Sequence, residues 1–338
     1  MVRKVEKNFT ELIDQKKVLF VTTKNIDYIR NAQEIRILRE HTKDCQVISS
    51  NKKNYVRRIF EVWIKLFIAD VKKADIVFIG FSPQLILPFF YFKLREKFVI
   101  VDFFISVYDT LVWDRKIFKD KGVAAKLSHW IDSITLKRAD YVITDTNADA
   151  DFFIKEFAGD NIKFETLYLE ADPSIYYPRK QHKRTDLANK FVVLYFGSIL
   201  PLQGVDIVLD AVRLLKNQES IFFQIIGPIS DNYNKPIQDN VEYIDWLSQD
   251  KLAEYIANAD LCLAGHFNGE IDKAKRTIPG KAYIYEAMAK TMILGENEAN
   301  KELFQKENRK IHYVQMGNKK ALADKIILIF EARSFIIQ

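Results

Sequence analysis

The sequence predicts an α/β protein built from two Rossmann-like, doubly wound parallel-sheet domains. Short strand patterns rich in β-branched residues alternate with amphipathic helical patterns along the whole chain. This alternation stops once, at a polar and basic interval, and then restarts. The length of 338 residues, with 48% hydrophobic residues, supplies enough apolar side chains for two cores.

The first domain is expected to span residues 1–184. Its expected strands are 18–22, 76–79, 98–101, 141–144 and 164–168, and its expected helices are 32–40, 56–71, 84–94, 124–137 and 148–157. Asp145 or Thr146 is expected to cap the last of these helices, because short polar side chains accept hydrogen bonds from free N–H groups there. The interval RKQHKRTDLANK that follows Pro178 has no periodicity, so we place the domain boundary within it.

The second domain is expected to span residues 185–330 and to repeat the same order, with a tail at 331–338. Its expected strands are 192–196, 222–226, 241–244, 261–264, 292–294 and 311–314, and its expected helices are 205–215, 249–257, 282–289 and 319–329. We expect the two domains to face one another across a cleft.

The first strand, loop and helix of this second domain, VVLYFGSILPLQGVDIVLDAVRLL, form its most informative segment. The apolar run stops at Gly197, and a short loop carrying Ser198, Gln203 and Gly204 leads into apolar residues at helical spacing. A helix N-terminus at the carboxyl end of a parallel strand presents free N–H groups and a positive dipole to anions. The segment therefore predicts a phosphate site, although two glycines alone also suit a plain tight connection.

Composition and charge exclude several classes of protein. The net charge of +6 suits anionic ligands or an acidic membrane surface, but no nucleic-acid recognition motif accompanies it. Cys45 and Cys262 lie far apart and the five histidines do not cluster, so we expect neither a metal site nor a disulfide. The charged N-terminus does not resemble a signal peptide, and no run reaches the roughly 18 apolar residues of a membrane span. A cytoplasmic location is expected.

The segment 55–73, YVRRIFEVWIKLFIADVKK, has two interpretations. Ile59, Trp63 and Phe67 alternate with several basic residues, as in a core-facing helix of an α/β domain or in a helix that lies on a membrane. The sequence favours the core-facing helix and leaves peripheral contact with the inner membrane surface open. The apolar run 85–92 is expected to form a buried helix.

Several segments resemble a known family. FGSILPLQGVDIVLDAVRLL, FQIIGP, NADLCLAGHFNGEIDKAKRTIPGKAYIYEAMA, ENEANKELF and HYVQMGNKKALADKI, within residues 191–330, resemble the donor-binding half of glycosyltransferase family four enzymes of the GT-B fold. VDFFISVYDTLVWDRK, KRADYVITDT and LYLEADPSIYYP resemble the acceptor domain and domain junction more loosely. The resemblance implies a polysaccharide-biosynthesis enzyme that moves a sugar from a nucleotide diphosphate sugar to a glycan or lipid-linked acceptor. It further implies retention of configuration, no metal and no permanently bound cofactor.

The resemblance also suggests donor-site residues. Ser198 and Gln203 stand where the family often has Arg and Lys on the diphosphate, so Arg276 and Lys281 are expected to supply the cations instead. Glu286, in YIYEAMA, resembles the carboxylate that accepts hydrogen bonds from the donor ribose. A gapless alignment would place Ile284 there.

The remaining candidates follow strands. His266 follows the strand 261–264 and could contact the sugar or stabilise its loop, and Asn300 and Glu302 resemble a loop beside sugar and diphosphate or the first turn of a helix. On the acceptor side, Asp102 and Asp109 follow the strand 98–101 and are candidates for a general base.

Two alternatives to this enzyme remain open. The family's first Glu would fall at Ile278, and the basic pair of the first loop is missing, so a non-catalytic GT-B-like module that binds nucleotide sugar or a partner transferase is one alternative. A different enzyme on the same architecture, such as an epimerase or a phosphorylase, is the other.

Overall fold

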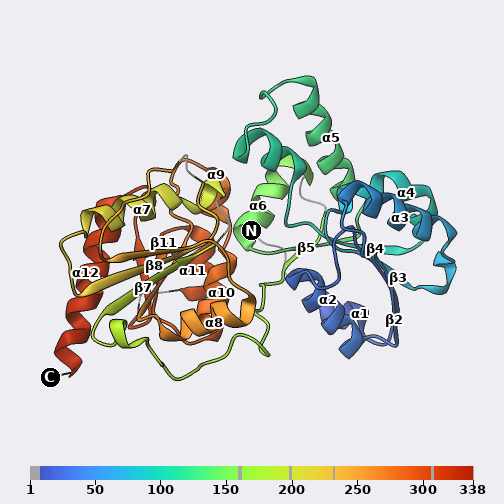
Figure 1. The fold of residues 1–338 in the computed structure, drawn as a ribbon. Coiled ribbons are helices and arrows are strands. Elements are labelled where there is room, and N and C mark those ends of the chain that lie inside the picture. Colours follow the sequence, from blue (N-terminus) through green and yellow to red (C-terminus); the bar gives the residue numbers. More distant parts are fainter. Residues whose placement is uncertain (1–7, 159–161, 198–199, 231–232, 306–307, 338) are drawn as a thin grey trace. The chain divides into compact units, whose positions relative to one another are not determined.

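The computed structural model describes residues 8–158, 162–197, 200–230, 233–305 and 308–337 (Figure 1). The chain divides into two compact units, Met1–Glu170 and Ala171–Gln338, called unit 1 and unit 2 below. This division lies ahead of the basic interval in which the sequence analysis placed the boundary. Among the described helices, none is long and apolar enough to cross a bilayer.

Unit 1 contains a six-stranded parallel sheet in the order β2-β1-β3-β4-β5-β6. The strands are β1 Lys17–Val21, β2 Asp44–Ile48, β3 Ile76–Ile79, β4 Phe98–Asp102, β5 Tyr141–Thr144 and β6 Phe164–Thr166. Strands β3 and β5 are buried along their whole length, as is usual for parallel strands covered on both faces. The sequence predicted all of these strands except β2.

Helices cover both faces of this sheet. They are α1 Phe9–Ile13, α2 Ile29–His41, α3 Tyr55–Ile68, α4 Leu87–Leu94, α5 Val123–Lys137 and α6 Asn147–Phe153, with π-helical segments at Asp109–Asp114 and Ile154–Ala158. Helices α1 and α2 pack on one face, and α3 to α6 pack on the other (Figure 1). Thr146 caps α6 by accepting a hydrogen bond from the N–H of Asp149 at 3.0 Å, which confirms the expected cap.

The structure contains a helix in the apolar run 85–92, as expected, but the prediction that this helix is buried was wrong. Leu87 and Leu94 of α4 are buried, but Phe89 is 58% exposed and Phe92 is 78% exposed. An apolar run of eight residues must present side chains on all sides of a helix, and the sheet can cover only one of those sides.

Unit 2 contains a second six-stranded parallel sheet, in the order β12-β11-β10-β7-β8-β9. The strands are β7 Phe191–Phe196, β8 Ile221–Ile226, β9 Val241–Ile244, β10 Leu261–Gly265, β11 Met292–Gly295 and β12 Ile311–Val314. All six were predicted. The helices are α7 Val205–Leu214, α8 Gln249–Asn258, α9 Asp272–Arg276, α10 Gly280–Ala287, α11 Glu298–Phe304 and α12 Lys319–Ile337.

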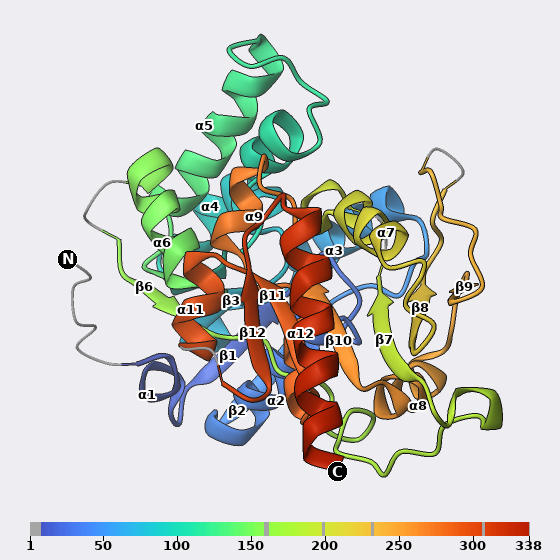
Figure 2. The same cartoon turned by 90° about the vertical axis from the view of Figure 1, so that its left-hand side faces the viewer.

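Helix α12 extends through residues 331–337, where the sequence analysis expected a tail. It packs beside α7 (Figure 2), and the ring of Phe330 lies 5.4 Å from that of Phe191. Arg333 forms an ion pair with the buried Asp260. The C-terminal part of α12 therefore packs against the core of unit 2 through Phe330 and Arg333.

Candidate functional site

Glycines end four adjacent strands of unit 2. Gly197 and Gly227 follow β7 and β8, and Gly265 and Gly295 end β10 and β11. A Cβ atom on Gly227 would lie 2.1 Å from the carbonyl oxygen of Gly197, and one on Gly295 would lie 1.9 Å from that of His266. Neighbouring loops thus approach one another more closely than any side chain allows, and peptide groups gather at this edge of the sheet.

The loop between β7 and α7 ends at the predicted glycine. Gly204 adopts a left-handed conformation with φ 65° and ψ 48°, and a Cβ there would lie 2.6 Å from the backbone nitrogen of Asn268. No side chain caps the N-terminus of α7 in the part of the chain that the structure describes. The N–H groups of its first turn are therefore not occupied by a capping side chain, so the predicted anion site stays a prediction. Ser198 lies outside the described residues.

Lys281 reaches this loop from α10. Its Nζ donates a hydrogen bond to Oε1 of Gln203 at 3.0 Å, and the hydroxyl of Tyr195 donates to the same oxygen at 3.0 Å. The Lys281 Nζ also lies 4.8 Å from the centre of the Tyr195 ring and would be 3.2 Å from a Cβ on Gly197. Lys281, the cation predicted to replace the lysine that the family often has in this loop, is thus hydrogen-bonded to Gln203, the residue at that lysine's position.

Burial changes the ionisation of two residues at this edge. Lys281 is 5% exposed, and loss of water lowers the pKa of its ammonium group to about 7. Burial also lowers the pKa of His266 well below its usual value, and the charges of Lys281 and Lys273 act in the same direction. The imidazole is therefore neutral, and its Nδ1 has no hydrogen-bond partner among the described residues. A buried polar atom without a partner is a candidate to contact a ligand.

Asn300 lies in the first turn of α11, one of its two expected positions. It is fully buried, and its Nδ2 donates to the carbonyl oxygen of Gly295 at 2.8 Å. Asn297 caps the helix by accepting from the Asn300 N–H at 2.6 Å. The Oδ1 of Asn300 has no hydrogen-bond partner among the described residues. Glu302, further along α11, is partly exposed.

Glu286 and Arg276 lie on neighbouring helices. Glu286 is on the surface of the last turn of α10, where partial loss of water raises the pKa of its carboxylate. Ile284, the other candidate for its role, is partly buried. Arg276 ends α9, which packs against the turn Pro201–Gln203 of the β7–α7 loop. The structure thus brings α9 and α10 to the loop that the sequence singled out.

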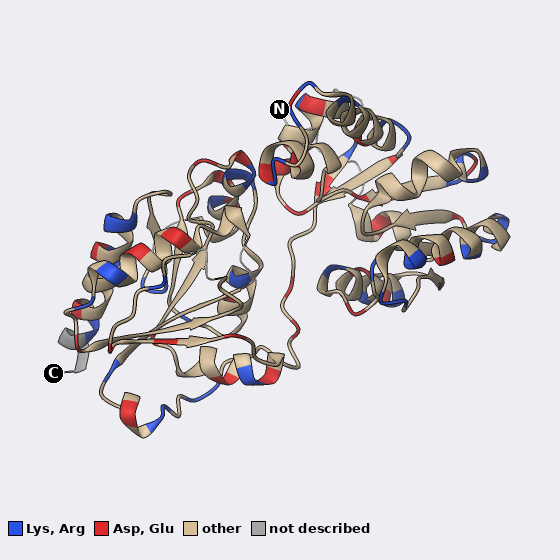
Figure 3. Ribbon diagram, turned by 45° about the horizontal axis from the view of Figure 1, so that its top comes forward, with Lys and Arg blue, Asp and Glu red and all other residues tan. Residues whose placement is uncertain are grey.

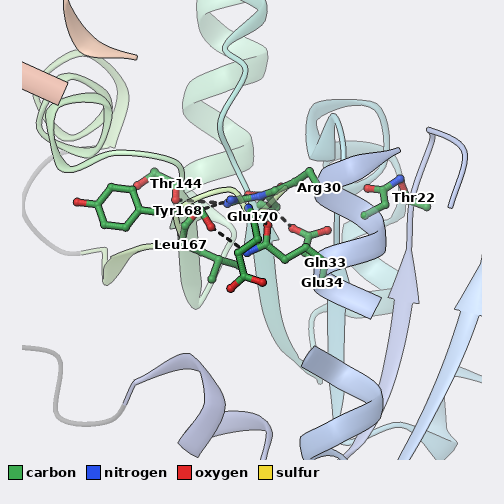
Figure 4. Close-up of polar contacts among 10 residues, drawn as sticks. Thr22, Arg30, Gln33, Glu34, Thr144, Leu167, Tyr168 and Glu170 are labelled. Carbon is green, nitrogen blue, oxygen red and sulfur yellow. Dashed lines mark hydrogen bonds and ion pairs between the residues drawn. The ribbon is translucent and has the colours of Figure 1, made fainter. Parts of the chain in front are cut away.

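The two proposed bases of unit 1 are both buried. Asp102 is 1% exposed, and its oxygens accept hydrogen bonds from Nη2 and Nε of Arg30 at 2.9 and 3.1 Å. Arg30 donates further to the carbonyl oxygens of Thr144, at 3.3 Å, and Leu167 (Figure 4). Asp102 therefore joins β4 to α2 through a buried ion pair, which favours a structural role. Asp109 is 2% exposed.

Sequence reasoning missed the third member of this cluster. Glu34 is fully buried, and its Oε1 lies 3.6 Å from Nε of Arg30. Burial and the nearby Asp102 carboxylate raise the pKa of Glu34 well above its usual value. The only available signal was the spacing of four residues between Arg30 and Glu34 on one helix.

Asp132 of α5 organises the loop that follows β4. Its carboxylate accepts hydrogen bonds from the Ser106 hydroxyl at 2.7 Å, the Tyr108 N–H at 2.8 Å and the Gln84 amide at 3.0 Å. Burial raises the pKa of Asp132 to about 6. No sequence signal indicated this residue. Among the described residues, no group of three or more His, Cys, Asp or Glu side chains could hold a metal ion.

Comparisons with known proteins agree with this architecture. Residues 178–335 match the family model "Glycosyl transferases group 1". The chain is 24% identical over 263 residues to the Pseudomonas aeruginosa protein named "Probable glycosyltransferase WbjE", a match that covers 72% of this chain and 64% of that relative's length.

Solved structures share the fold over almost the whole chain. Sucrose-phosphate synthase from Thermosynechococcus elongatus superimposes with a TM-score of 0.65 at 13% identity, covering 94% of this chain and 90% of that one. Anabaena HepE in complex with UDP superimposes with a TM-score of 0.66 at 13% identity, covering 93% and 90%. The two parallel sheets and these neighbours together show a two-domain GT-B fold, and the family match of residues 178–335 supports a glycosyltransferase of this type.

Proposed function

We propose that the protein transfers a sugar from a nucleotide diphosphate sugar to a hydroxyl group of a glycan or lipid-linked acceptor. In this proposal unit 2 binds the donor and unit 1 binds the acceptor. The observation that carries the proposal is the position of Lys281, which meets the β7–α7 loop beside the uncapped N-terminus of α7. The UDP complex of the structural neighbour HepE supports a nucleotide donor.

The proposed reaction breaks the bond between the anomeric carbon and the diphosphate oxygen and forms a bond from that carbon to the acceptor oxygen. Negative charge therefore develops on the leaving diphosphate, where the α7 N–H groups and the Lys281 ammonium stabilise it. We further propose that the reaction retains configuration and needs no metal. The leaving phosphate oxygen then takes the acceptor proton, a role for which the buried Asp102 and Asp109 are poorly placed.

The donor is tested by thermal stabilisation with UDP, GDP, ADP and TDP and their sugar conjugates. A ligand at 100 times its Kd stabilises the native state by about 2.7 kcal/mol, so one member of the panel should raise the unfolding temperature. Lys281→Met should weaken the binding of that ligand by roughly tenfold or more, because it removes the cation while keeping a side chain of similar length. Lys216→Met, which changes an exposed lysine of unit 2, is the matched control. Failure of every nucleotide to bind would overturn the proposal.

A non-catalytic module that binds nucleotide sugar is the alternative. Gln203 in place of a loop lysine and the buried Ile278 at the position of the first Glu favour it. Turnover separates the two: transfer or donor hydrolysis above background that Glu286→Ala abolishes supports the enzyme. Tight donor binding without turnover on a panel of acceptors supports the module.

A further inference from the structure

Helices α3 and α4 of unit 1 leave a broad apolar surface exposed. Its side chains are each between 57% and 78% exposed, and they are Val56, Phe60, Ile64, Phe67 and Ile68 of α3 and Phe89 and Phe92 of α4. We call this set the α3–α4 surface. Contiguous apolar patches of this kind on a folded protein mark sites of interaction, whereas single exposed apolar residues do not.

The α3–α4 surface is continuous across the two helices. Trp63 of α3 lies between them, with its ring 5.9 Å from that of Phe60 and 4.9 Å from that of Phe89. The indole N–H of Trp63 donates to the carbonyl oxygen of Leu85 at 2.8 Å. The Lys93 Nζ of α4 lies 5.7 Å from the centre of the Phe67 ring. These contacts hold the exposed rings as one preformed face.

Helix α3 is apolar on two opposite sides. Val62 and Leu66 face the core of unit 1, and the exposed apolar residues recur at helical spacing on the other side. A helix that only covers a sheet needs a single apolar stripe. Burial in the core therefore explains one side of α3 and leaves the other without a partner among the described residues.

The positive charge of the chain is concentrated around this surface. Residues 52–97 contain ten basic and four acidic side chains, an excess of six that equals the net charge of +6 of the whole chain. Several of the basic residues are exposed. Lys52 and Lys53 precede α3, Arg57 lies in its first turn, Lys72 and Lys73 follow it, and Arg95 follows α4. Figure 3 colours these charges along the ribbon. The Arg95 guanidinium lies 5.8 Å from the centre of the Phe92 ring, so cation and apolar group belong to the same face.

We propose that the α3–α4 surface docks the protein onto an anionic phospholipid membrane. The aromatic and aliphatic side chains insert at the boundary of headgroups and acyl chains, while the surrounding lysines and arginines contact lipid phosphates. A second copy of this chain would bring like charges together around the same apolar centre, which disfavours self-association. The proposal is independent of the transferase function, because it needs neither donor nor acceptor.

The test is co-sedimentation of the full-length protein with vesicles, in the absence of nucleotide sugar. Binding to phosphatidylcholine vesicles that contain phosphatidylglycerol should exceed binding to pure phosphatidylcholine by roughly tenfold, and about 0.5 M salt should weaken it. The double variant Phe67→Ser/Phe92→Ser should lose roughly tenfold in binding, because two inserted rings are removed. Ile237→Ser/Trp246→Ser is the matched control, since both side chains are exposed apolar residues of unit 2.

Charge is tested separately. Lys72→Glu/Lys73→Glu should abolish the preference for phosphatidylglycerol, whereas Lys216→Glu/Lys310→Glu, an equal change at exposed lysines of unit 2, should preserve it. Equal sedimentation of the Phe67→Ser/Phe92→Ser variant and its control would overturn the proposal. So would a wild-type dimer that this variant converts to monomers without any vesicle binding, because that result assigns the surface to a second copy.

Discussion

Lys281 combines two properties that rarely occur together, a charge-bearing group and nearly complete burial. Without a ligand, its pKa of about 7 leaves the amine mostly neutral above neutral pH. The unfolded chain then binds more protons than the native state, so this residue makes stability rise with pH between about 7 and its ordinary pKa of 10.5. A diphosphate beside it has the opposite effect on the pKa, because an anion favours the ammonium form.

Donor binding at pH 8 should therefore take up close to one proton. Titration calorimetry in two buffers of different ionisation enthalpy measures this uptake, and the affinity should fall as the pH rises above 7. Lys281→Met should bind the same nucleotide more weakly and without uptake. If the variant takes up as many protons as the wild type, another group titrates and the proposed contact is wrong.

Glu34 offers a second test at the scale of a residue, in unit 1. Its pKa is raised above the ordinary 4.5, so the native state binds a proton that the unfolded chain releases. The stabilising effect of this proton is complete below pH 4.5 and is lost as the pH rises through the native pKa. Glu34→Gln keeps the neutral shape, so its stability should gain on that of the wild type as the pH increases from 5 to 8. Urea unfolding at a series of pH values measures the difference, and parallel curves would contradict it.

At the scale of the element, the ends of the strands set the geometry of the donor edge. Gly295→Ala would place a methyl group 1.9 Å from the carbonyl oxygen of His266, so β11 and the loop after β10 must move apart. We expect a loss of about 3 kcal/mol in the free energy of unfolding, as for other overpacked sites. Gly280→Ala is the control: no atom lies within 4 Å of its added Cβ, and a helical alanine should stabilise by about 0.5 kcal/mol. Similar urea midpoints for both variants would show that the strand ends are not close-packed.

The elements differ in how far the sequence predicts them. Strands buried on both faces are largely apolar runs, which is why β7, β8, β10 and β11 were predicted. The edge strands β9 and β12 are only partly buried, but each begins and ends with a β-branched residue. The edge strand β2, DCQVI, has polar residues at its start and only its last residue buried, so it gave no such run. For α4 the pattern indicated a helix correctly, but an apolar run cannot show which of its sides meets the sheet.

The same limit applies to the candidate site. The glycines of the β7–α7 loop indicated that loop in the sequence. The resemblance of the segment around Lys281 to a known family indicated Lys281. The contact between Gln203 and Lys281 joins residues 78 positions apart, and that between Arg30 and Asp102 joins residues 72 apart. Such pairs depend on the order of strands in the sheet, which periodicity does not contain. Asp102 consequently looked like an acceptor-side base, whereas the structure pairs it with Arg30.

At the scale of the whole molecule, the two units have separate sheets and separate hydrophobic cores. Helix α12 belongs to unit 2, since Phe330 and Arg333 contact Phe191 and Asp260. Each unit therefore contains the interactions that a cooperative folding unit needs, and unfolding of the chain should depart from a single two-state transition.

Differential scanning calorimetry should accordingly resolve two transitions that respond to different changes. The nucleotide found by the panel should raise only the transition of unit 2, since it binds that native unit alone, and Gly295→Ala should lower the same one. Arg30→Met should lower only the transition temperature of unit 1. It should cost about 3 kcal/mol or more of that unit's free energy of unfolding, because it leaves the buried Asp102 carboxylate without its partner. A single transition that the nucleotide raises and both variants lower would mean that the units unfold together, and would contradict independent cores.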